Sequence, residues 1–109
     1  MFKAGRHTIE VADTVLAMGT GRLLLVDVRD DSERARGFAP GSQHLPLSEL
    51  KQRLAGLPND RPIAFVCESG RRSALATTAA LRAGLDARNV RGGMAAWRRQ
   101  GLDIERGTP

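Results

Sequence analysis

The sequence has one cysteine, no tyrosine and no long apolar run, and each scarcity excludes a class of protein. The lone Cys67 cannot form an internal disulfide, so the chain is no disulfide scaffold and gives no sign of an oxidising compartment. The longest apolar run, residues 23–26, is too short to cross a bilayer, and residues 1–7 lack the apolar segment of a secretory signal. We therefore expect a cytoplasmic protein without membrane association.

Lysine and aromatic residues are also scarce. Fifteen of the seventeen basic residues are arginine, and the net charge is +5. This charge suits an anionic partner, either nucleic acid, a small anion or an acidic protein. The basic residues are mixed with acidic ones, and one tryptophan and three phenylalanines offer little for base stacking, which argues against nucleic acid.

The 109 residues and 41% hydrophobic content are those of one globular domain, which we place at 1–109 with a core of about 8–102 and short tails. We expect a monomer. Apolar runs alternate with helical patterns, which predicts an α/β fold with a mainly parallel sheet. Continuous apolar runs predict strands buried on both faces at 23–28 and 62–67. Shorter strands are expected at 6–9, 43–47 and 87–90.

Helices are expected between these strands, at 9–18, 30–36, 48–57, 71–83 and after residue 93. Thr8 and Ser48 are the expected caps of the first and third helices. In the fourth helix, Leu75, Ala79 and Leu81 are expected to face inward. The apolar face of the first helix is expected to consist of Val11, Val15, Leu16 and Met18. The tail from residue 103 to 109 is expected to fray.

The most informative segment starts at Cys67, at the end of a predicted strand. It reads Cys67-Glu68-Ser69-Gly70-Arg71-Arg72-Ser73. In a turn of this kind, backbone N–H groups converge into an anion-binding nest, and a helix N-terminus adds positive charge. Together with two arginines, these features should lower the pKa of the thiol and make the thiolate a nucleophile. The alternative is a buried, inert cysteine, which the glycine turn and the arginines make less favoured.

The spacing within this loop separates two chemistries. Four residues lie between Cys67 and Arg72, whereas a cysteine phosphatase usually needs five to surround a phosphoryl group. The narrower loop favours a sulfur atom. Ser69 and Ser73 have no nearby base, and the two histidines and one cysteine lie too far apart in the sequence for a metal site.

Four stretches of the sequence matter together. In chain order they are Leu25-Val26-Asp27-Val28-Arg29, Gly41-Ser42-Gln43-His44-Leu45-Pro46-Leu47, the loop from Cys67 to Ser73, and Gly92-Gly93-Met94-Ala95-Ala96-Trp97. With these four stretches the sequence resembles the single-domain rhodanese (thiosulfate sulfurtransferase-like) family. The resemblance implies a five-stranded parallel sheet flanked by helices on both faces. It also implies that Cys67 takes the outer sulfur of a donor such as thiosulfate as a persulfide, without metal or organic cofactor. The acceptor would be cyanide, a thiol or a sulfur-accepting protein.

The same resemblance assigns roles to the loop. Backbone amides from Glu68 to Ser73 would hold the persulfide sulfur, and Arg71 or Arg72 would attract the small anionic donor. Glu68 is expected to offset these arginines and to weaken binding of dianionic thiosulfate, which leaves the donor open.

Outside the loop, Asp27, Arg29 and Glu33 are expected to support the site. Asp27 and Glu33 would each pair with a loop arginine or else serve only the fold. His44 is expected to be packed or on the surface, Trp97 to pack against the sheet, and Gly92-Gly93 to let the last helix approach the loop. Two other functions stay open: a non-catalytic docking module for an acidic partner, and a phosphatase- or arsenate-reductase-like enzyme.

Overall fold

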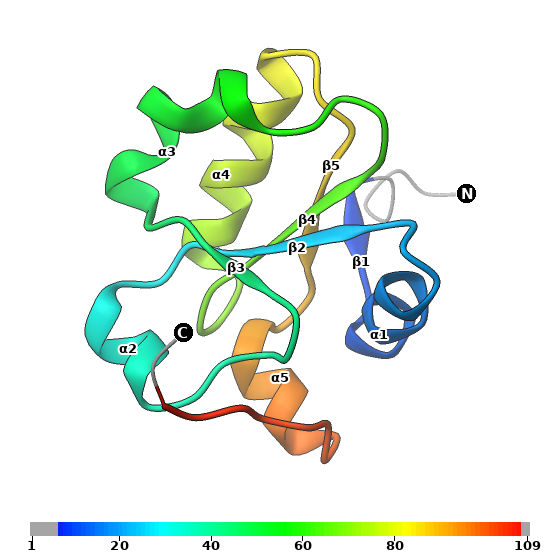
Figure 1. Cartoon of the computed structure of the whole chain (residues 1–109), viewed down its shortest axis with the longest axis vertical. Coiled ribbons are helices and arrows are strands. Elements are labelled where there is room, and N and C mark those ends of the chain that lie inside the picture. Colours follow the sequence, from blue (N-terminus) through cyan, green and yellow to red (C-terminus); the bar gives the residue numbers. More distant parts are fainter. Residues whose placement is uncertain (1–6, 108–109) are drawn as a thin grey trace.

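Residues 7–107 of the chain, as described by a computed structural model, form a five-stranded, entirely parallel sheet of order β1-β5-β4-β2-β3 (Figure 1). The strands are β1 (Thr8–Ile9), β2 (Leu24–Asp27), β3 (Gln43–His44), β4 (Ile63–Val66) and β5 (Ala87–Val90). The predicted parallel sheet is confirmed, and each strand lies at or within its predicted range. Residue 6 of the expected first strand lies outside the described residues.

Helices cover both faces of the sheet, as predicted (Figure 1). They are α1 (Val11–Gly19), α2 (Asp31–Ala35), α3 (Leu47–Arg53), α4 (Arg71–Arg82) and α5 (Gly93–Arg99), with a 3₁₀ turn at Leu54–Gly56. Alternate residues of β2 and β4 enter two different cores. Val26 and Phe65 pack towards α3 and α4, whereas Leu25 and Val66 pack towards α1 and α5. This two-sided burial is why these strands are apolar throughout.

Both predicted helix caps are wrong. Thr8 belongs to β1, where it pairs in register with Asn89, so α1 begins only at Val11 with Glu10 as its N-cap. Ser48 lies inside α3, and the N-cap is Pro46. The backbone of Thr8 pairs with β5 in the sheet, so this residue cannot also be the N-cap of α1.

The inward face of α4 also differs from the prediction. Its buried residues are small, namely Ser73, Ala76, Thr77 and Ala80, while Leu75 is 64% exposed. Ala79 and Leu81 are half-buried at the edge of the core. Small side chains let the helix backbone lie close to the sheet, an arrangement that a count of large apolar residues does not reveal. Leu16 of α1 is likewise 70% exposed, contrary to the prediction.

The C-terminal segment is bound to the fold, so the predicted fraying is wrong for residues 103–105. The Trp97 indole N–H donates to the Asp103 carbonyl at 2.8 Å, which gives this buried polar group its partner. Glu105 then forms an antiparallel bridge with Phe38. Thr108 and Pro109 lie outside the described residues. Within residues 7–107, no helix combines the length and apolar character that crossing a lipid bilayer requires.

Candidate active site

The sheet order brings two chemically active strand ends together. β2 and β4 are neighbours in register, with Asp27 opposite Val66, and the Val28 N–H donates to the Val66 carbonyl at 2.9 Å. Cys67 therefore begins its loop beside the residues that end β2. This edge is where parallel sheets place their ligands.

The loop after Cys67 folds back over the sulfur. Gly70 adopts φ of +106°, a left-handed conformation that side chains disfavour, and so turns the chain directly into α4. The Gly70 and Ser73 N–H groups donate to Sγ at 3.1 and 3.3 Å. The Ser73 hydroxyl lies 3.2 Å from the same sulfur. These contacts form the nest that the sequence predicted.

Cys67 is only 1% exposed, so its sulfur lies at the floor of the loop rather than projecting into an open crevice. Burial raises the pKa of the Cys67 thiol because it disfavours the charged form. Hydrogen bonds from the Ser73 hydroxyl and from backbone N–H groups of the loop oppose this effect. The hydrogen bonds prevail, and the pKa lies below its ordinary value, as predicted.

The two loop arginines have different surroundings. Arg72 makes two hydrogen bonds to Glu33 of α2, at 2.7 and 2.8 Å, which confirms the predicted pairing of Glu33 with a loop arginine. This guanidinium lowers the pKa of Glu33, and Glu33 in turn raises that of Arg72. Arg71 is exposed and has no ion pair with any residue in the described range 7–107. Arg71 is thus the loop cation whose charge is available to a ligand.

Asp27 does not pair with a loop arginine, so of the two roles expected for it that pairing is wrong. Its carboxylate is completely buried and accepts hydrogen bonds from Arg29 at 2.8–3.2 Å and from Arg34 at 3.4 Å. Arg29 also donates to the Gly37 carbonyl, and Arg34 to the Ser42 carbonyl, both at 2.8 Å. Both arginines are close to Asp27 in the chain. Because their hydrogen bonds occupy the two carboxylate oxygens, Asp27 has no oxygen left for a loop arginine.

Glu68 also has partners other than those expected. Its carboxylate binds Arg98 of α5 at 2.6 and 3.1 Å and lies 3.6 Å from Arg29. The Arg98 guanidinium lowers the pKa of Glu68. The expected direct offset of Arg71 and Arg72 is therefore replaced by pairing with Arg98 of α5 and with Arg29, which follows β2.

Helix α5 begins against the loop, as its two glycines predicted. Met94 and Ala95 N–H donate to the carbonyls of Cys67 and Glu68 at 2.8 and 3.0 Å. A Cβ atom on Gly93 would lie only 2.5 Å from the Cys67 carbonyl oxygen. The first turn of α5 thus finds acceptors in the loop, and glycine is required for that approach.

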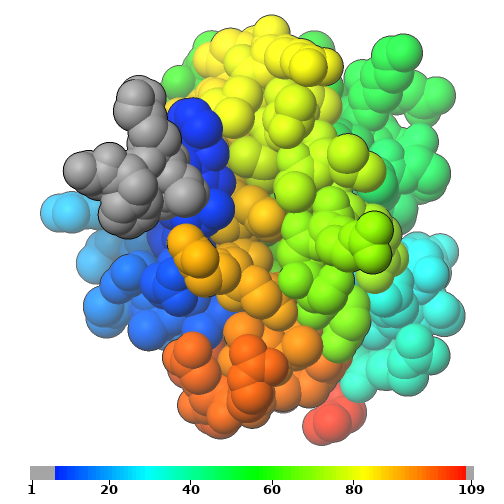
Figure 2. All heavy atoms as spheres, turned by 180° about the vertical axis from the view of Figure 1, so that it is seen from behind, coloured from blue at the N-terminus to red at the C-terminus, as the bar shows by residue number. Residues whose placement is uncertain are grey.

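Asn89 of β5 is a site residue that the sequence did not reveal. Its side chain joins two parts of the loop: Oδ1 accepts from the Ser73 hydroxyl at 2.6 Å, and Nδ2 donates to the Gly70 carbonyl at 3.0 Å. Figure 2 shows the face of the molecule on which α4 (yellow-green) lies against β5 (gold), the strand that carries Asn89. The only indication in the sequence was a polar residue within a predicted strand. Its proximity to the loop could be recognised only once the order of the strands in the sheet was known.

The remaining candidates lie where the sequence placed them. The His44 ring nitrogen Nε2 lies 2.8 Å from the Arg29 carbonyl oxygen, so this half-buried residue supports the end of β2. Trp97 is 2% exposed and packs in the core between the sheet, α1 and α5. Among residues 7–107, no three His, Cys, Asp or Glu side chains gather as metal ligands.

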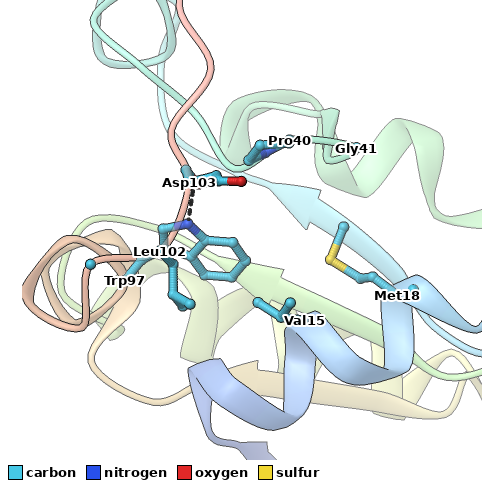
Figure 3. A pocket seen from close by; sticks show the side chains of 9 residues that line it. Val15, Met18, Pro40, Gly41, Trp97, Leu102 and Asp103 are labelled. Atoms are coloured by element: carbon cyan, nitrogen blue, oxygen red, sulfur yellow. Dashed lines mark hydrogen bonds between the residues drawn. The ribbon is translucent and has the colours of Figure 1, made fainter.

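An apolar cavity of about 450 Å³ lies away from the loop, between α1 and the chain after α5 (Figure 3). Its walls include Val15 and Met18 on one side and Trp97 and Leu102 on the other, with Pro40 above (Figure 3). None of its lining residues belongs to the loop of residues 67–73.

Comparison with known proteins places these features in a family context. The model of the rhodanese-like domain family matches residues 11–100. A sulfurtransferase of Allochromatium vinosum is 38% identical over 86 residues, covering 78% of this chain and 80% of that protein. Human thiosulfate:glutathione sulfurtransferase is 31% identical, covering 86% of this chain and 95% of that protein. The crystal structure of a rhodanese-related protein from Thermoplasma volcanium superposes with a TM-score of 0.85 at 29% identity, covering 91% of this chain and 97% of that one.

Proposed function

The chain belongs to the rhodanese-like domain family, and we propose that it moves a sulfane sulfur from a donor to a thiophilic acceptor through a persulfide on Cys67. The relatives named above are sulfurtransferases, which supports sulfur transfer as the activity. The observation that carries the proposal is the loop itself. The only cysteine of the sequence lies under two backbone N–H donors, with its pKa lowered.

The transfer proceeds in two displacements. The Cys67 thiolate attacks the outer sulfur of an anionic donor such as thiosulfate, and a new sulfur–sulfur bond forms. The bond between that sulfur and the sulfonate sulfur breaks, and its electron pair leaves with sulfite. An acceptor thiolate or cyanide then attacks the outer sulfur of the persulfide, which returns Cys67 to the thiolate. No external oxidant or reductant takes part.

The backbone N–H groups serve both displacements. They stabilise negative charge on the cysteine sulfur before the attack and on the persulfide after it, and they need no rearrangement because Gly70 and α4 already hold them in place. Because Glu68 is compensated by Arg98, we propose that it does not prevent use of an anionic donor.

Incubation of the wild-type protein with thiosulfate tests this function. Intact-mass spectrometry should show a gain of one sulfur atom, which cyanide or a thiol removes. Loading should slow as the pH falls through the lowered pKa of Cys67, because only the thiolate attacks. Mercaptopyruvate and a cysteine persulfide serve as alternative donors. A protein that takes sulfur from none of the three is no sulfurtransferase, and turnover of a phosphate ester would favour phosphatase chemistry instead.

Arg71 is proposed as the residue that attracts the donor, because Arg72 is held by Glu33. In the Arg71→Ala variant we expect the KM for thiosulfate to rise about two- to fivefold, the range of an exposed charge interaction, with kcat little changed. The effect should shrink at high salt. Steady-state kinetics at two ionic strengths provide the measurement.

The matched control for this variant is Arg82→Ala, which removes an equally charged, exposed residue from the far end of the same helix. An equal rise of KM in both variants would mean that net charge, and not Arg71, attracts the donor.

A further inference from the structure

The Ser73 hydroxyl lies between two groups that can each use its single hydrogen. Its oxygen is 3.2 Å from Cys67 Sγ and 2.6 Å from Asn89 Oδ1. Ser73 is completely buried, so within the described structure these two neighbours compete without bulk water. A hydroxyl has one hydrogen to donate and lone pairs to accept, so it can donate to only one of them at a time.

The Gly70 carbonyl determines which way the Asn89 amide faces. A carbonyl oxygen only accepts, so the Asn89 group that lies 3.0 Å from it must be the NH₂. Oδ1 therefore faces Ser73, and because Oδ1 cannot donate, the hydroxyl hydrogen points towards Asn89 as long as Cys67 keeps its proton, so the bond by which Ser73 favours the charged sulfur forms only on ionisation. The Ser73 oxygen is then free to accept the hydrogen of the Cys67 thiol.

Loss of the thiol proton changes this balance. The thiolate has no hydrogen to give and gains from every donor that reaches it. The Ser73 hydroxyl can donate to the sulfur only by leaving Asn89, whose Oδ1 then lacks that bond. We propose that Asn89 is a positioning residue that competes with the Cys67 sulfur for the Ser73 hydroxyl hydrogen, and so limits how far Ser73 stabilises the thiolate.

The charged groups around Cys67 are fixed by other pairs. On α4, Arg72 attracts the thiolate, and Glu33 of α2 compensates it. Beside the cysteine, Glu68 is compensated by Arg98 of α5 and approached by Arg29 at the end of β2. The last charged group near Cys67 is Arg71, which is exposed. None of these side chains bonds to Asn89 or Ser73, so variants at these two positions leave the pairs in place.

Ionisation of Cys67, followed by thiolate absorbance and by the pH dependence of alkylation, tests the competition. In Asn89→Leu the hydroxyl is free to serve the sulfur, and the thiol pKa should fall by roughly one pH unit. Asn89→Asp keeps an acceptor for Ser73 and adds a negative charge, so the pKa should rise. Both variants lose the bond to the Gly70 carbonyl, so a loosened loop alone would move the pKa the same way in both. That result would overturn the proposal.

A double-mutant cycle tests whether Asn89 affects the Cys67 sulfur through the Ser73 hydroxyl. In a Ser73→Ala background, Asn89→Leu should no longer lower the thiol pKa, because the hydroxyl that transmits the effect is gone. A decrease that persists in this background would show that Asn89 acts on the sulfur by another path and would overturn the proposal.

The competition can also be tested in the wild-type protein, without relying on a variant that folds. The side-chain carbonyl carbon of Asn89, followed by nuclear magnetic resonance, should change its chemical shift with the same midpoint as Cys67 ionisation. A resonance that does not respond would overturn the proposal. The inference concerns the same cysteine as the proposed function, but every readout is thiol ionisation. It can therefore fail while sulfur transfer is found, or hold while transfer is not.

Discussion

The Cys67→Ser variant is expected to lose sulfur transfer, by at least about a thousandfold in kcat, while keeping its fold. A serine oxygen cannot form the persulfide, and its hydroxyl stays protonated at neutral pH even with the loop donors in place. The fold should persist because the hydroxyl occupies nearly the same volume and can accept from the Gly70 and Ser73 N–H groups. Thiocyanate formation from thiosulfate and cyanide gives the rate, and thermal melting reports the fold.

Cys67→Ala is the companion variant, since it removes the sulfur without offering a hydroxyl to the loop. Both variants should also fail to gain mass with thiosulfate. A folded variant that still transfers sulfur would show that the sulfur is carried elsewhere, and the proposed function would be abandoned. Alkylated wild-type protein provides an independent test of the same cysteine.

The Asp27→Ala variant is expected to lose about 3–5 kcal/mol of unfolding free energy, because it leaves buried arginines without their counter-charge. Arg29 is 1% exposed and Arg34 3% exposed, so neither can recover the loss through water. Single domains are stable by only about 5–15 kcal/mol, so much of the protein could unfold at 37 °C. Denaturation by urea, compared with the wild type, gives the change.

Two further substitutions serve as controls for the change in stability of Asp27→Ala. Asp27→Asn keeps the hydrogen-bond acceptor but not the charge, and Asp60→Ala removes an exposed carboxylate. We expect Asp60→Ala to change stability by less than about 0.5 kcal/mol. An Asp27→Ala protein as stable as the wild type would mean that the bonds of Asp27 to its two buried arginines contribute nothing to the stability of the folded state. Since Arg29 also approaches Glu68, a folded Asp27→Ala protein should transfer sulfur more slowly.

The parts of this molecule that the sequence predicted are those set by local signals. The apolar run that contains Leu25 and Val26 could only be a strand covered on both faces, and the structure buries both residues completely. Because glycine has no side chain, Gly70 predicted the tight turn before α4, and Gly93 predicted the close approach of α5 to the loop. These features depend on neighbours in the chain, so pattern and spacing were enough.

What the sequence did not predict is which charged side chains the fold buries and which distant segments it brings together. Asn89 became a site residue only because β5 lies next to β4 in the sheet. Asp27 took its partners from Arg29 and Arg34 because both side chains turn inward, which their charge alone argued against. Glu105 pairs with Phe38 across the fold. For Asn89 and Glu105 the partner lies far away in the chain, and for Asp27 the partners are near in the chain but buried, which a count of charges does not predict.

The order of the sheet also determines when, during synthesis, the loop after Cys67 can gain its contacts with the rest of the fold. Cys67 leaves the ribosome before Asn89 and Met94, the residues that later bond to Gly70 and to the Cys67 carbonyl. β5 is made last of the five strands in this sheet, and it also carries the register partner of Thr8 in β1. Pairing of segments so far apart comes late in folding because loop closure must precede it. A nascent chain can therefore form the turn from Cys67 to Ser73, but the contacts that join this loop to β5 and α5 arise only once the whole sheet has closed.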